Sequence, residues 1–574
     1  MSRRITREVS KLVALAPTGS CGAELSELAM FCSSVDDKGL SAEAFARAGG
    51  LGAIAAAVTA SNGRNWPATH LLVNGEGYED EVHALLHTCS LLLRKCHKQV
   101  LRMAVESPLV DALTIACGEA QHPRIGVVTA AADVVGTLAS ACDYNALRGV
   151  ELGLLDSVLR SAKAITVRNE RELMAMRVTN SERQETQSDV PASLVESNTQ
   201  LDSPKKLKTL ERAVKRALIA SGLDVPRRPR GGKRGVRILS LDGGGTRALA
   251  SLEVVREIER QTQRPICESF DLIGGTSSGG VLALALGLRQ SSVTDCEDVY
   301  KAMASRIFSR ATRVISAGRL LLLNKGQYNT KALESVLQEA LGTSVLVETR
   351  LDMPNGPRVF VVSTMMSAPT AVPYLHANYR PPPRPPGSGE HRYRHGCHHT
   401  LWEAARASTA VPSYFDAFRS GEEVFCDGAI LVNNPAAIAV HEARLLWPNA
   451  PLECIVSVGT GRPDISTKAG SENLYDVAKA LINSATDTEA VHHALEDLAP
   501  EGVYYRFNPV IPIDIGSDET RKNVLEDVQK SARQYVLNNG EHFRELAVRL
   551  SQGYSNEEES TAVKKWWPRW STRL

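Results

Sequence analysis

A serine between two glycines is the first group in this sequence that could act as a nucleophile. In FDLIGGTSSGG, an apolar run leads into Gly275, Ser277 and Gly279, and a helical pattern follows. Glycines on both sides permit a sharp turn that presents the hydroxyl above a sheet, while the helix N-terminus stabilises nearby negative charge. This context predicts a nucleophilic serine, although the pentapeptide alone is also typical of an ordinary turn after a strand.

A glycine-rich loop earlier in the chain could stabilise an oxyanion. The run VRILSL is followed by Asp242 and then by three glycines, Gly243, Gly244 and Gly245. Arg247 stands two positions after the last glycine. Consecutive glycines at a strand-to-helix turn expose main-chain N–H groups, which a developing oxyanion requires. The arginine could orient the loop, meet a phosphate or cap the loop. A nucleotide site is less favoured, because neither the Walker pattern nor G-x-G-x-x-G is present.

The candidate base is an aspartate at the end of another apolar run. A serine hydroxyl becomes a good nucleophile only when a base takes its proton. In VFCDGAILVNNP, Asp427 is followed by Gly428, which would let the backbone turn so that the carboxylate faces the serine. An Asp-Gly pair alone more often marks a tight turn. The aspartate is therefore a base only if the fold brings it to Ser277.

A Ser-Asp-His triad is the main alternative to a dyad. Ordinary α/β-hydrolases place the histidine after the acid in the chain, and it lies in a loop that follows a strand. The histidines after Asp427 lie in helical or amphipathic segments instead, and packing or surface roles fit them better: His441, His492, His493 and His542. The sequence therefore favours a dyad without histidine.

The elements that must position these groups alternate between strands and helices over residues 234–550. Candidate strands are VRILSL, FDLIGG, VFVVSTM, EVFCD and ECIVSVGTG, and helical patterns cover residues 247–263 and 279–288. Such alternation predicts an α/β domain with a mostly parallel sheet and helices on both faces.

The first 165 residues are predicted to be all-helical. Apolar residues recur at helical spacing, and three similar segments lie near Leu51, Leu109 and Leu154. Their spacing fits stacked helical repeats, and the small-residue turn before an apolar helix resembles armadillo repeats. This resemblance implies a possible protein partner on the repeats, whereas a plain helical bundle is the alternative.

Three further segments could contact a membrane or lie on the protein surface. Residues 166–233 read as a polar linker followed by a basic amphipathic helix, which could lie on an anionic membrane or pack on the next domain. The insertion at 380–399 could be a mobile basic flap or a tolerated surface insertion. A metal site formed by its histidines is less favoured. The tail at 551–574 carries Trp566, Trp567 and Trp570 beside basic residues, which suits an interfacial anchor or packing onto the domain.

Taken together and in this order, the serine turn, the glycine loop and the Asp-Gly pair resemble patatin-like phospholipases. LWEAARASTAVPSYF, INSATDTEAVHHAL and VYYRFNP extend the likeness to the calcium-independent phospholipase A2 branch of the gamma type. The resemblance implies a three-layer α/β/α hydrolase domain with a Ser277–Asp427 dyad, an oxyanion hole formed by residues 243–245, and no metal or organic cofactor. One departure is Ala248, where the family usually has glycine.

The composition limits the class of protein and its location in the cell. The 574 residues are 43% hydrophobic and 23% charged with a net charge of +1, and no apolar run is long enough to span a bilayer. Eleven scattered cysteines and no secretory signal favour an intracellular protein, cytoplasmic or peripheral on an organelle membrane, with no role in nucleic-acid binding. We therefore expect an enzyme that cleaves fatty acyl esters of membrane glycerophospholipids. The alternatives are an acyltransferase or neutral-lipid lipase on the same dyad, or a repeat-based scaffold recruited to lipid.

Overall fold

The chain divides by its internal contacts into two units, residues 1–224 and 225–574, and each is described by itself. The computed structural model describes, in the second unit, Pro229 and residues 234–308, 327–384, 391–463, 488–511 and 515–551. In the first unit it describes residues 109–118, 124–141, 152–185 and 202–224, with shorter stretches and single residues between 72 and 149.

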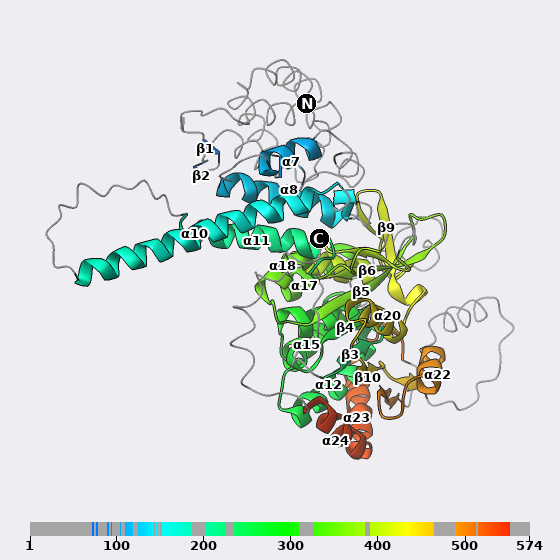
Figure 1. Cartoon of the computed structure of the whole chain (residues 1–574). Coiled ribbons are helices and arrows are strands. Elements are labelled where there is room, and N and C mark those ends of the chain that lie inside the picture. The colour runs from blue at the N-terminus through cyan, green and yellow to red at the C-terminus, as the bar shows by residue number, and fades with distance from the viewer. Residues whose placement is uncertain are drawn as a thin grey trace, which may run out of the picture. The chain divides into compact units, whose positions relative to one another are not determined.

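The described part of the first unit is mainly helical (Figure 1). Its principal helices are α7 (Leu109–Gly118), α8 (Ile125–Ala141), α10 (Leu154–Glu185) and α11 (Pro204–Ala220). A short antiparallel pair, β1 (Leu72–Val73) with β2 (Glu76–Gly77), is a departure from the expected all-helical region. The helices share one apolar core, which agrees with the predicted helical character. The armadillo-like arrangement remains a prediction, and the segment near Leu51 lies outside the described residues.

The predicted linker boundary differs from the structure. Helix α10 runs unbroken from Leu154 to Glu185, across the expected boundary at residues 165 and 166. The sequence ERELMAMR after that boundary consists of good helix formers, so its polarity does not end the helix. Residues 186–201, which carry the rest of the expected linker, lie outside the described residues.

The amphipathic helix after the linker belongs to the first unit. Ser203 caps the N-terminus of α11, where its hydroxyl accepts a hydrogen bond from the N–H of Lys206. The apolar face, which includes Leu210, Val214 and Leu218, is buried in the same core as α8. Both earlier expectations for this face, a membrane surface and the next domain, are therefore wrong, because α8 and its neighbours already cover it.

The second unit is built on a mixed sheet in the order β12-β10-β3-β4-β5-β6-β7 (Figure 1). The first five strands of this order are parallel, β6 is antiparallel to β5, and β7 is parallel to β6. Their bounds are β3 (Val236–Leu241), β4 (Leu272–Thr276), β5 (Arg358–Met365), β6 (Val372–Ala377), β7 (Arg394–Gly396), β10 (Leu452–Val458) and β12 (Tyr504–Phe507). This confirms the expected α/β domain.

Helices cover both faces of the sheet. Along β3, Leu239 and Leu241 pack in one core with residues of α12, α14, α15 and α24, while Val236 and Ile238 pack in another with α20. Alternate residues of a strand point to opposite faces, so these two cores lie on opposite sides of one sheet. All residues of β3, β4 and β5 are buried, as expected for central strands covered on both faces.

The remaining elements of this unit surround the sheet. They are η3 (Gly245–Arg247), α12 (Ala248–Thr262), α13 (Ile266–Ser269), α14 (Ser278–Leu284), η4 (Ala285–Arg289), α15 (Val293–Arg306), α17 (Thr330–Leu341), α18 (Leu346–Asp352), α19 (Leu401–Ser408), β8 (Phe418–Ser420), β9 (Glu423–Asp427), η7 (Gly428–Ile430), α20 (Ala436–Leu446), β11 (Arg462–Pro463), α22 (Glu489–Leu498), β13 (Val510–Ile511), α23 (Lys522–Asn538) and α24 (Gly540–Ser551). Of the helices that the structure describes, none has the length and hydrophobicity to cross a bilayer.

Strand β9 positions the candidate base. On one side of β5, β4 pairs as far as Thr276 opposite Val362, and the pairing with β9 starts at Ser363, opposite Asp427, the last residue of β9. Because β6 occupies the other side of β5 at both positions, β4 and β9 follow one another along the same edge. The end of β4 and the end of β9 therefore meet at neighbouring positions of one buried strand.

The insertion at 380–399 is not a flap where it is described. Residues 394–396 form β7 in the sheet, and His395 and Cys397 are buried. The imidazole of His395 and the hydroxyl of Tyr379 both bond to the carboxylate of Glu442, at 2.9 Å each, which fixes this segment to α20. Residues 385–390 and the Trp-rich tail from residue 552 lie outside the described residues.

Candidate active site

Ser277 stands at a strained turn between β4 and α14. Its backbone angles are φ 53° and ψ −123°, and a non-glycine residue seldom adopts positive φ. A Cβ on Gly275 would collide with the main chain of Gly279, and a Cβ on Gly279 would collide with the carbonyl of Leu241. Both flanking positions must therefore be glycine for the turn to form, as the spacing in the sequence indicates.

The structure brings Ser277 and Asp427 into direct contact. The serine Oγ donates a hydrogen bond of 2.7 Å to Oδ2 of the aspartate, and Oδ1 accepts one of 2.7 Å from the N–H of Ala429. Only 7% of Ser277 and 2% of Asp427 are exposed. Gly428 is required next to the aspartate, because a Cβ there would meet the carbonyl oxygen of Val362. Three sequence-predicted residues, Ser277, Asp427 and Gly428, thus lie together.

The environment of Asp427 favours a carboxylate that can take up a proton. Burial raises the pKa of Asp427 to about 7, and the hydrogen bonds from Ser277 and Ala429 only partly oppose this shift. No arginine or lysine is among the causes of the shift. A carboxylate whose pKa lies near neutrality can accept a proton from a neighbouring hydroxyl more readily than an ordinary aspartate can.

The glycine loop lies directly against this pair. A Cβ on Gly243 would come within 3.1 Å of the Cβ of Ser277 and within 2.5 Å of Oδ1 of Asn433. The N–H of Gly243 donates to the Asn433 carbonyl at 3.2 Å, and the N–H of Gly244 donates to the Ser278 hydroxyl at 3.0 Å. Gly245 has φ +61°, which favours glycine. The glycine loop therefore lies beside the pair, but the amides of Gly243 and Gly244 donate to protein oxygens, and the oxyanion hole stays a prediction.

The two charged residues of this loop have structural contacts. Arg247 is half-buried and its Nε donates to the carbonyl of Gly244 at 3.4 Å, so its side chain contacts the glycine loop. Asp242 is buried, and its Oδ2 lies 2.7 Å from Nη2 of Arg506. Burial raises the pKa of Asp242 to about 6, and Arg506 opposes that shift.

Sequence reasoning missed Ser408, which holds the nucleophile turn. Its Oγ accepts a hydrogen bond of 2.7 Å from the N–H of Ser277 and donates one of 2.6 Å to the carbonyl of Val362. Ser408 is fully buried at the end of α19, in the segment LWEAARAS. The only available signal was a polar residue at the end of an otherwise apolar helix face, and such residues are common.

The candidate triad histidines do not contact the pair. Among the described residues, the carboxylate of Asp427 accepts hydrogen bonds from the Ser277 hydroxyl and the Ala429 N–H, and its main-chain carbonyl accepts one from the Thr364 hydroxyl, so no imidazole bonds to it. His441 packs against Tyr393, and His542 packs against Tyr505. His492 and His493 lie together on α22. The direct contact between hydroxyl and carboxylate favours a dyad over a triad.

The histidines of the 380–399 insertion do not gather around a metal. His395 is bonded to Glu442, and Nδ1 of His399 lies 3.1 Å from Nδ1 of His376, which in turn bonds to Ser363. Within the described residues, these side chains do not form a cluster of ligand atoms close enough to share an ion.

Comparisons with known proteins agree with this geometry. The sequence model of the patatin-like phospholipase family matches residues 239–440. Calcium-independent phospholipase A2-gamma of Oryctolagus cuniculus is 39% identical over 350 residues, and that of Homo sapiens is 38% identical over 350 residues; each alignment covers 60% of this chain and 43% of the relative. Phospholipase A I of Arabidopsis thaliana is 32% identical over 375 residues, which are 57% of this chain and 28% of that protein.

The chain thus spans less than half the length of these relatives. A solved structure, VipD from Legionella pneumophila, aligns with 55% of this chain and 69% of its own, but the TM-score of 0.32 and identity of 11% are too low to support an argument. The family match covers both Ser277 and Asp427. Residues 239–440 therefore match the patatin-like phospholipase family, and the chain is similar to proteins of the calcium-independent phospholipase A2-gamma type.

Proposed function

We propose that this protein hydrolyses fatty acyl esters of membrane glycerophospholipids, with Ser277 as the nucleophile and Asp427 as the general base. The observation that supports this most directly is the 2.7 Å hydrogen bond from the serine hydroxyl to a buried carboxylate. The names of the relatives, all of them phospholipases, support the substrate class. Neither step below needs a metal ion or an organic cofactor.

In the first half-reaction, Oγ of Ser277 attacks the carbonyl carbon of the ester as Asp427 takes the hydroxyl proton. The carbonyl π electrons move to oxygen and form a tetrahedral oxyanion. When the oxyanion collapses, the ester C–O bond breaks and Asp427 returns the proton to the leaving lysophospholipid oxygen. The product on the enzyme is a fatty acyl ester of Ser277.

In the second half-reaction, water replaces the lysophospholipid. Asp427 takes a proton from the water as its oxygen attacks the acyl carbon, and a second tetrahedral intermediate collapses to free fatty acid. The proton then returns from Asp427 to Oγ of Ser277. One carboxylate thus serves both halves, which a pKa near neutrality allows.

The oxyanion would be held by the loop at residues 243–245. The amides of Gly243 and Gly244 donate to the Asn433 carbonyl and the Ser278 hydroxyl, so they must exchange these acceptors for the oxyanion. Such an exchange is favourable when the new acceptor carries a full negative charge. The nucleophile's own N–H takes no part, because Ser408 accepts its hydrogen bond.

Exposed apolar side chains close to the base in the chain support action at a lipid surface. Leu431, four residues after Asp427, is 40% exposed, and Met366, whose N–H bonds to the Val424 carbonyl of β9, is 47% exposed. An exposed apolar side chain near an active site can insert between lipid acyl chains. A protein partner for the helical first unit stays a prediction from its resemblance to repeats.

The function is tested with the purified full chain and phosphatidylcholine vesicles. Fatty acid release is expected from the unmodified protein and not from Ser277→Ala, and a fluorophosphonate should label Ser277 alone by mass mapping. Lysophospholipid and diacylglycerol are added in separate arms, because esterified acceptor would identify acyl transfer. Equal fatty acid release by Ser277→Ala and the unmodified protein would refute the dyad.

The lipid-surface contact has its own test. Leu431→Asp should lower the hydrolysis of vesicle phospholipid severalfold, because a charge there opposes insertion, and it should leave the hydrolysis of a soluble short-chain ester unchanged. Leu498→Asp, at an exposed leucine of α22, serves as the matched control. A similar loss on both substrates would mean that Leu431 supports the fold or the site instead of the surface contact.

A further inference from the structure

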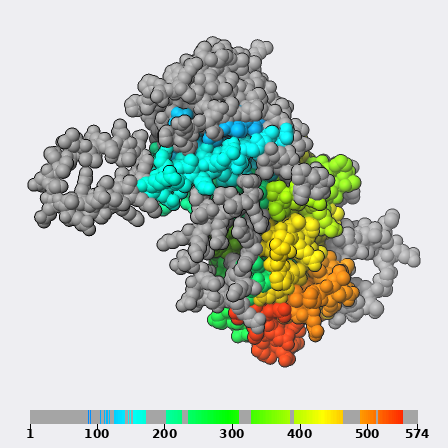
Figure 2. Space-filling view, in the orientation of Figure 1, coloured from blue at the N-terminus to red at the C-terminus, as the bar shows by residue number. Residues whose placement is uncertain are grey.

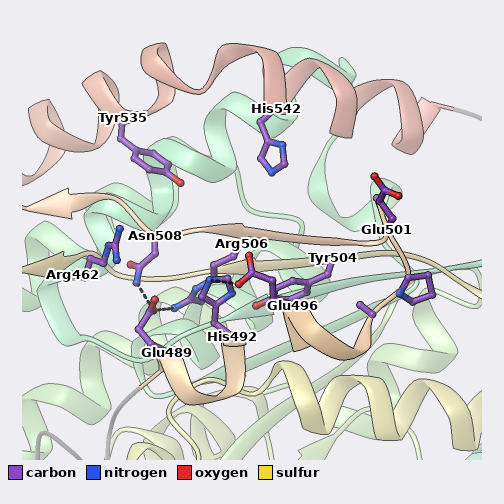
Figure 3. A pocket seen from close by; sticks show the side chains of 13 residues that line it. Arg462, Glu489, His492, Glu496, Glu501, Tyr504, Arg506, Asn508, Tyr535 and His542 are labelled. Carbon is purple, nitrogen blue, oxygen red and sulfur yellow. Dashed lines mark hydrogen bonds and ion pairs between the residues drawn. The ribbon is translucent and has the colours of Figure 1, made fainter. Parts of the chain in front are cut away.

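A polar pocket outside the dyad lies between α22 and β12 on one side and α23 and α24 on the other (Figure 3). Its volume is about 410 Å³. In the space-filling view, the orange residues of α22 and β12 border the red C-terminal helices on the visible face (Figure 2). The mechanism above uses none of the side chains that line it, yet one of them, Arg506, pairs with Asp242 at the start of the glycine loop.

Helix α22 carries a group of metal-ligand side chains, of which Glu489 and His492 line this pocket and His493 is exposed. Glu489, His492 and His493 each offer a ligand atom, and these atoms lie within 4.8 Å of one another. The three positions are i, i+3 and i+4, which share one side of a helix. Glu496, one further turn along, has its carboxylate 3.8 Å from Nε2 of His492. Two imidazoles with one or two carboxylates form a donor set that suits zinc.

The distances require only small side-chain movements to close around an ion. Ligand atoms around a tetrahedral zinc lie about 3.3 Å apart, given metal–ligand bonds of about 2.0–2.1 Å. His493 is exposed and Glu489 and His492 are partly buried, so rotation of the imidazoles can bring the atoms from 4.8 Å to that spacing. In Figure 3, Glu489, His492 and Glu496 project from the same side of α22 toward β12.

The charges of the pocket and one ring nitrogen favour a cation. Three glutamates line the pocket, Glu489, Glu496 and Glu501, against two arginines, and one of these arginines is already paired with Asp242. His492 is partly buried. Its Nδ1 is buried and bonds to none of the described residues.

We propose that Glu489, His492 and His493 form a site for a divalent cation of the zinc class, with Glu496 or water as the fourth ligand. The site is distinct from the dyad, and hydrolysis does not need it. Nothing in the proposed reaction calls for an ion at α22, so the site is regulatory.

The regulatory effect follows from a chain of ion pairs and rests on the proposed function. Oε1 of Glu489 accepts hydrogen bonds from Nη2 of Arg506 at 3.1 Å and from Nδ2 of Asn508 at 3.0 Å. The same Nη2 lies 2.7 Å from Asp242, the residue before the glycine loop. An ion that binds Glu489 withdraws one of the two carboxylates that share Nη2 of Arg506, and so changes the pairing of Arg506 with Asp242 beside the loop. Zinc therefore changes the hydrolysis rate.

Isothermal titration of the untagged full chain with ZnCl₂, after removal of metal by a chelator, tests the site. His492→Ala and His493→Ala should each weaken the binding of one zinc ion by at least about tenfold. His493 is exposed, so this variant is expected to fold normally, and circular dichroism checks it. Glu501→Gln is the matched control, because it removes a charge from the same pocket but none of the three ligands.

Each outcome decides one part of the proposal. Unchanged zinc affinity in His493→Ala, or an equal loss in Glu501→Gln, would overturn the site. Zinc binding that leaves the hydrolysis of a soluble ester unchanged would overturn the link through Arg506. The titration needs no catalysis, and Ser277→Ala should bind zinc as the unmodified protein does, so failure of the site and failure of the proposed hydrolysis are distinguishable.

Discussion

Asp427 and Asp242 are two buried aspartates beside the same nucleophile turn, and burial raises the pKa of both, to about 7 and about 6. Their partners differ in charge. Asp427 is bonded to a hydroxyl and a main-chain N–H, whereas Asp242 lies 2.7 Å from the guanidinium of Arg506. A carboxylate with neutral partners can gain and lose a proton without breaking an ion pair. The carboxylate with a cationic partner keeps its charge and fixes the loop.

The largest expected effect comes from removal of the charge of Asp427. Asp427→Asn should lower kcat/KM by about 10²–10⁴-fold, because the isosteric amide cannot accept the serine proton. The same variant should melt at a higher temperature at pH 8, since burial makes the carboxylate anion costly in the folded state. Hydrolysis of a soluble ester and thermal melting measure the two effects.

The sign of that stability gain depends on pH. The pKa of Asp427 is higher in the folded than in the unfolded chain, so the folded protein loses stability as pH rises from about 4 to about 7. The melting difference between Asp427→Asn and the unmodified protein should therefore be present at pH 8 and absent at pH 4. A lower melting temperature for the variant at pH 8 would contradict the description of Asp427 as a buried carboxylate anion whose hydrogen-bond partners are uncharged.

Loss of the partner should be more costly at Asp242. Arg506→Gln leaves the buried carboxylate without its cation, and we expect a loss of about 3–5 kcal/mol in the free energy of unfolding. The Ser277→Ala variant removes one hydrogen bond to Asp427 while the N–H of Ala429 still donates, and its cost should be about 1.5–3 kcal/mol. Denaturant unfolding of both variants compares them, and equal losses would mean that the two aspartates do not differ as described.

The pH dependence of hydrolysis should follow Asp427. Below pH 7 the carboxylate becomes protonated and cannot accept the serine proton, so kcat/KM should fall tenfold per pH unit and about a hundredfold by pH 5. This decrease of kcat/KM below pH 7 should be absent from the residual activity of Asp427→Asn. A midpoint near pH 4 in the unmodified protein would show that burial does not raise the pKa of the base in solution.

The smallest effect is expected from Ser408. Ser408→Ala removes the acceptor of the Ser277 N–H and should lower kcat about tenfold with little change in KM, because the turn is less well fixed while substrate contacts remain. Ser408→Thr keeps a hydroxyl and should recover most of the rate. A loss of stability without slower fluorophosphonate labelling would assign Ser408 to packing alone.

Ser277 and Asp427 could be predicted from the sequence because the glycines beside them indicate sharp turns of the local backbone. Gly275, Gly279 and Gly428 are each forced by a main-chain collision within a few residues or with the adjoining strand, and such constraints are visible in short patterns. Ser408 and Arg506 could not be predicted in the same way. Ser408 lies 131 positions after Ser277 in the chain, and Arg506 lies on β12. Only the folded sheet brings these two residues to the site.

The errors concern helices whose partners were not known. The amphipathic pattern of α11 correctly predicted one apolar face, but periodicity alone does not identify α8 as the element that covers it. Likewise, residues 166–185 were assigned to a linker because they are polar, although their helix formers continue α10. Polarity separates buried from exposed residues, whereas helix propensity decides where a helix ends.

The succession of β4 and β9 along β5 also bears on how this protein family can diversify. The spacing between nucleophile and base is set by main-chain pairing to Val362 and Ser363, within a strand that is buried throughout. Loops, insertions and lining side chains can therefore be exchanged around the dyad without a change in its separation. Mutations in those surrounding parts are free to accumulate, while the contact between Ser277 and Asp427 is kept.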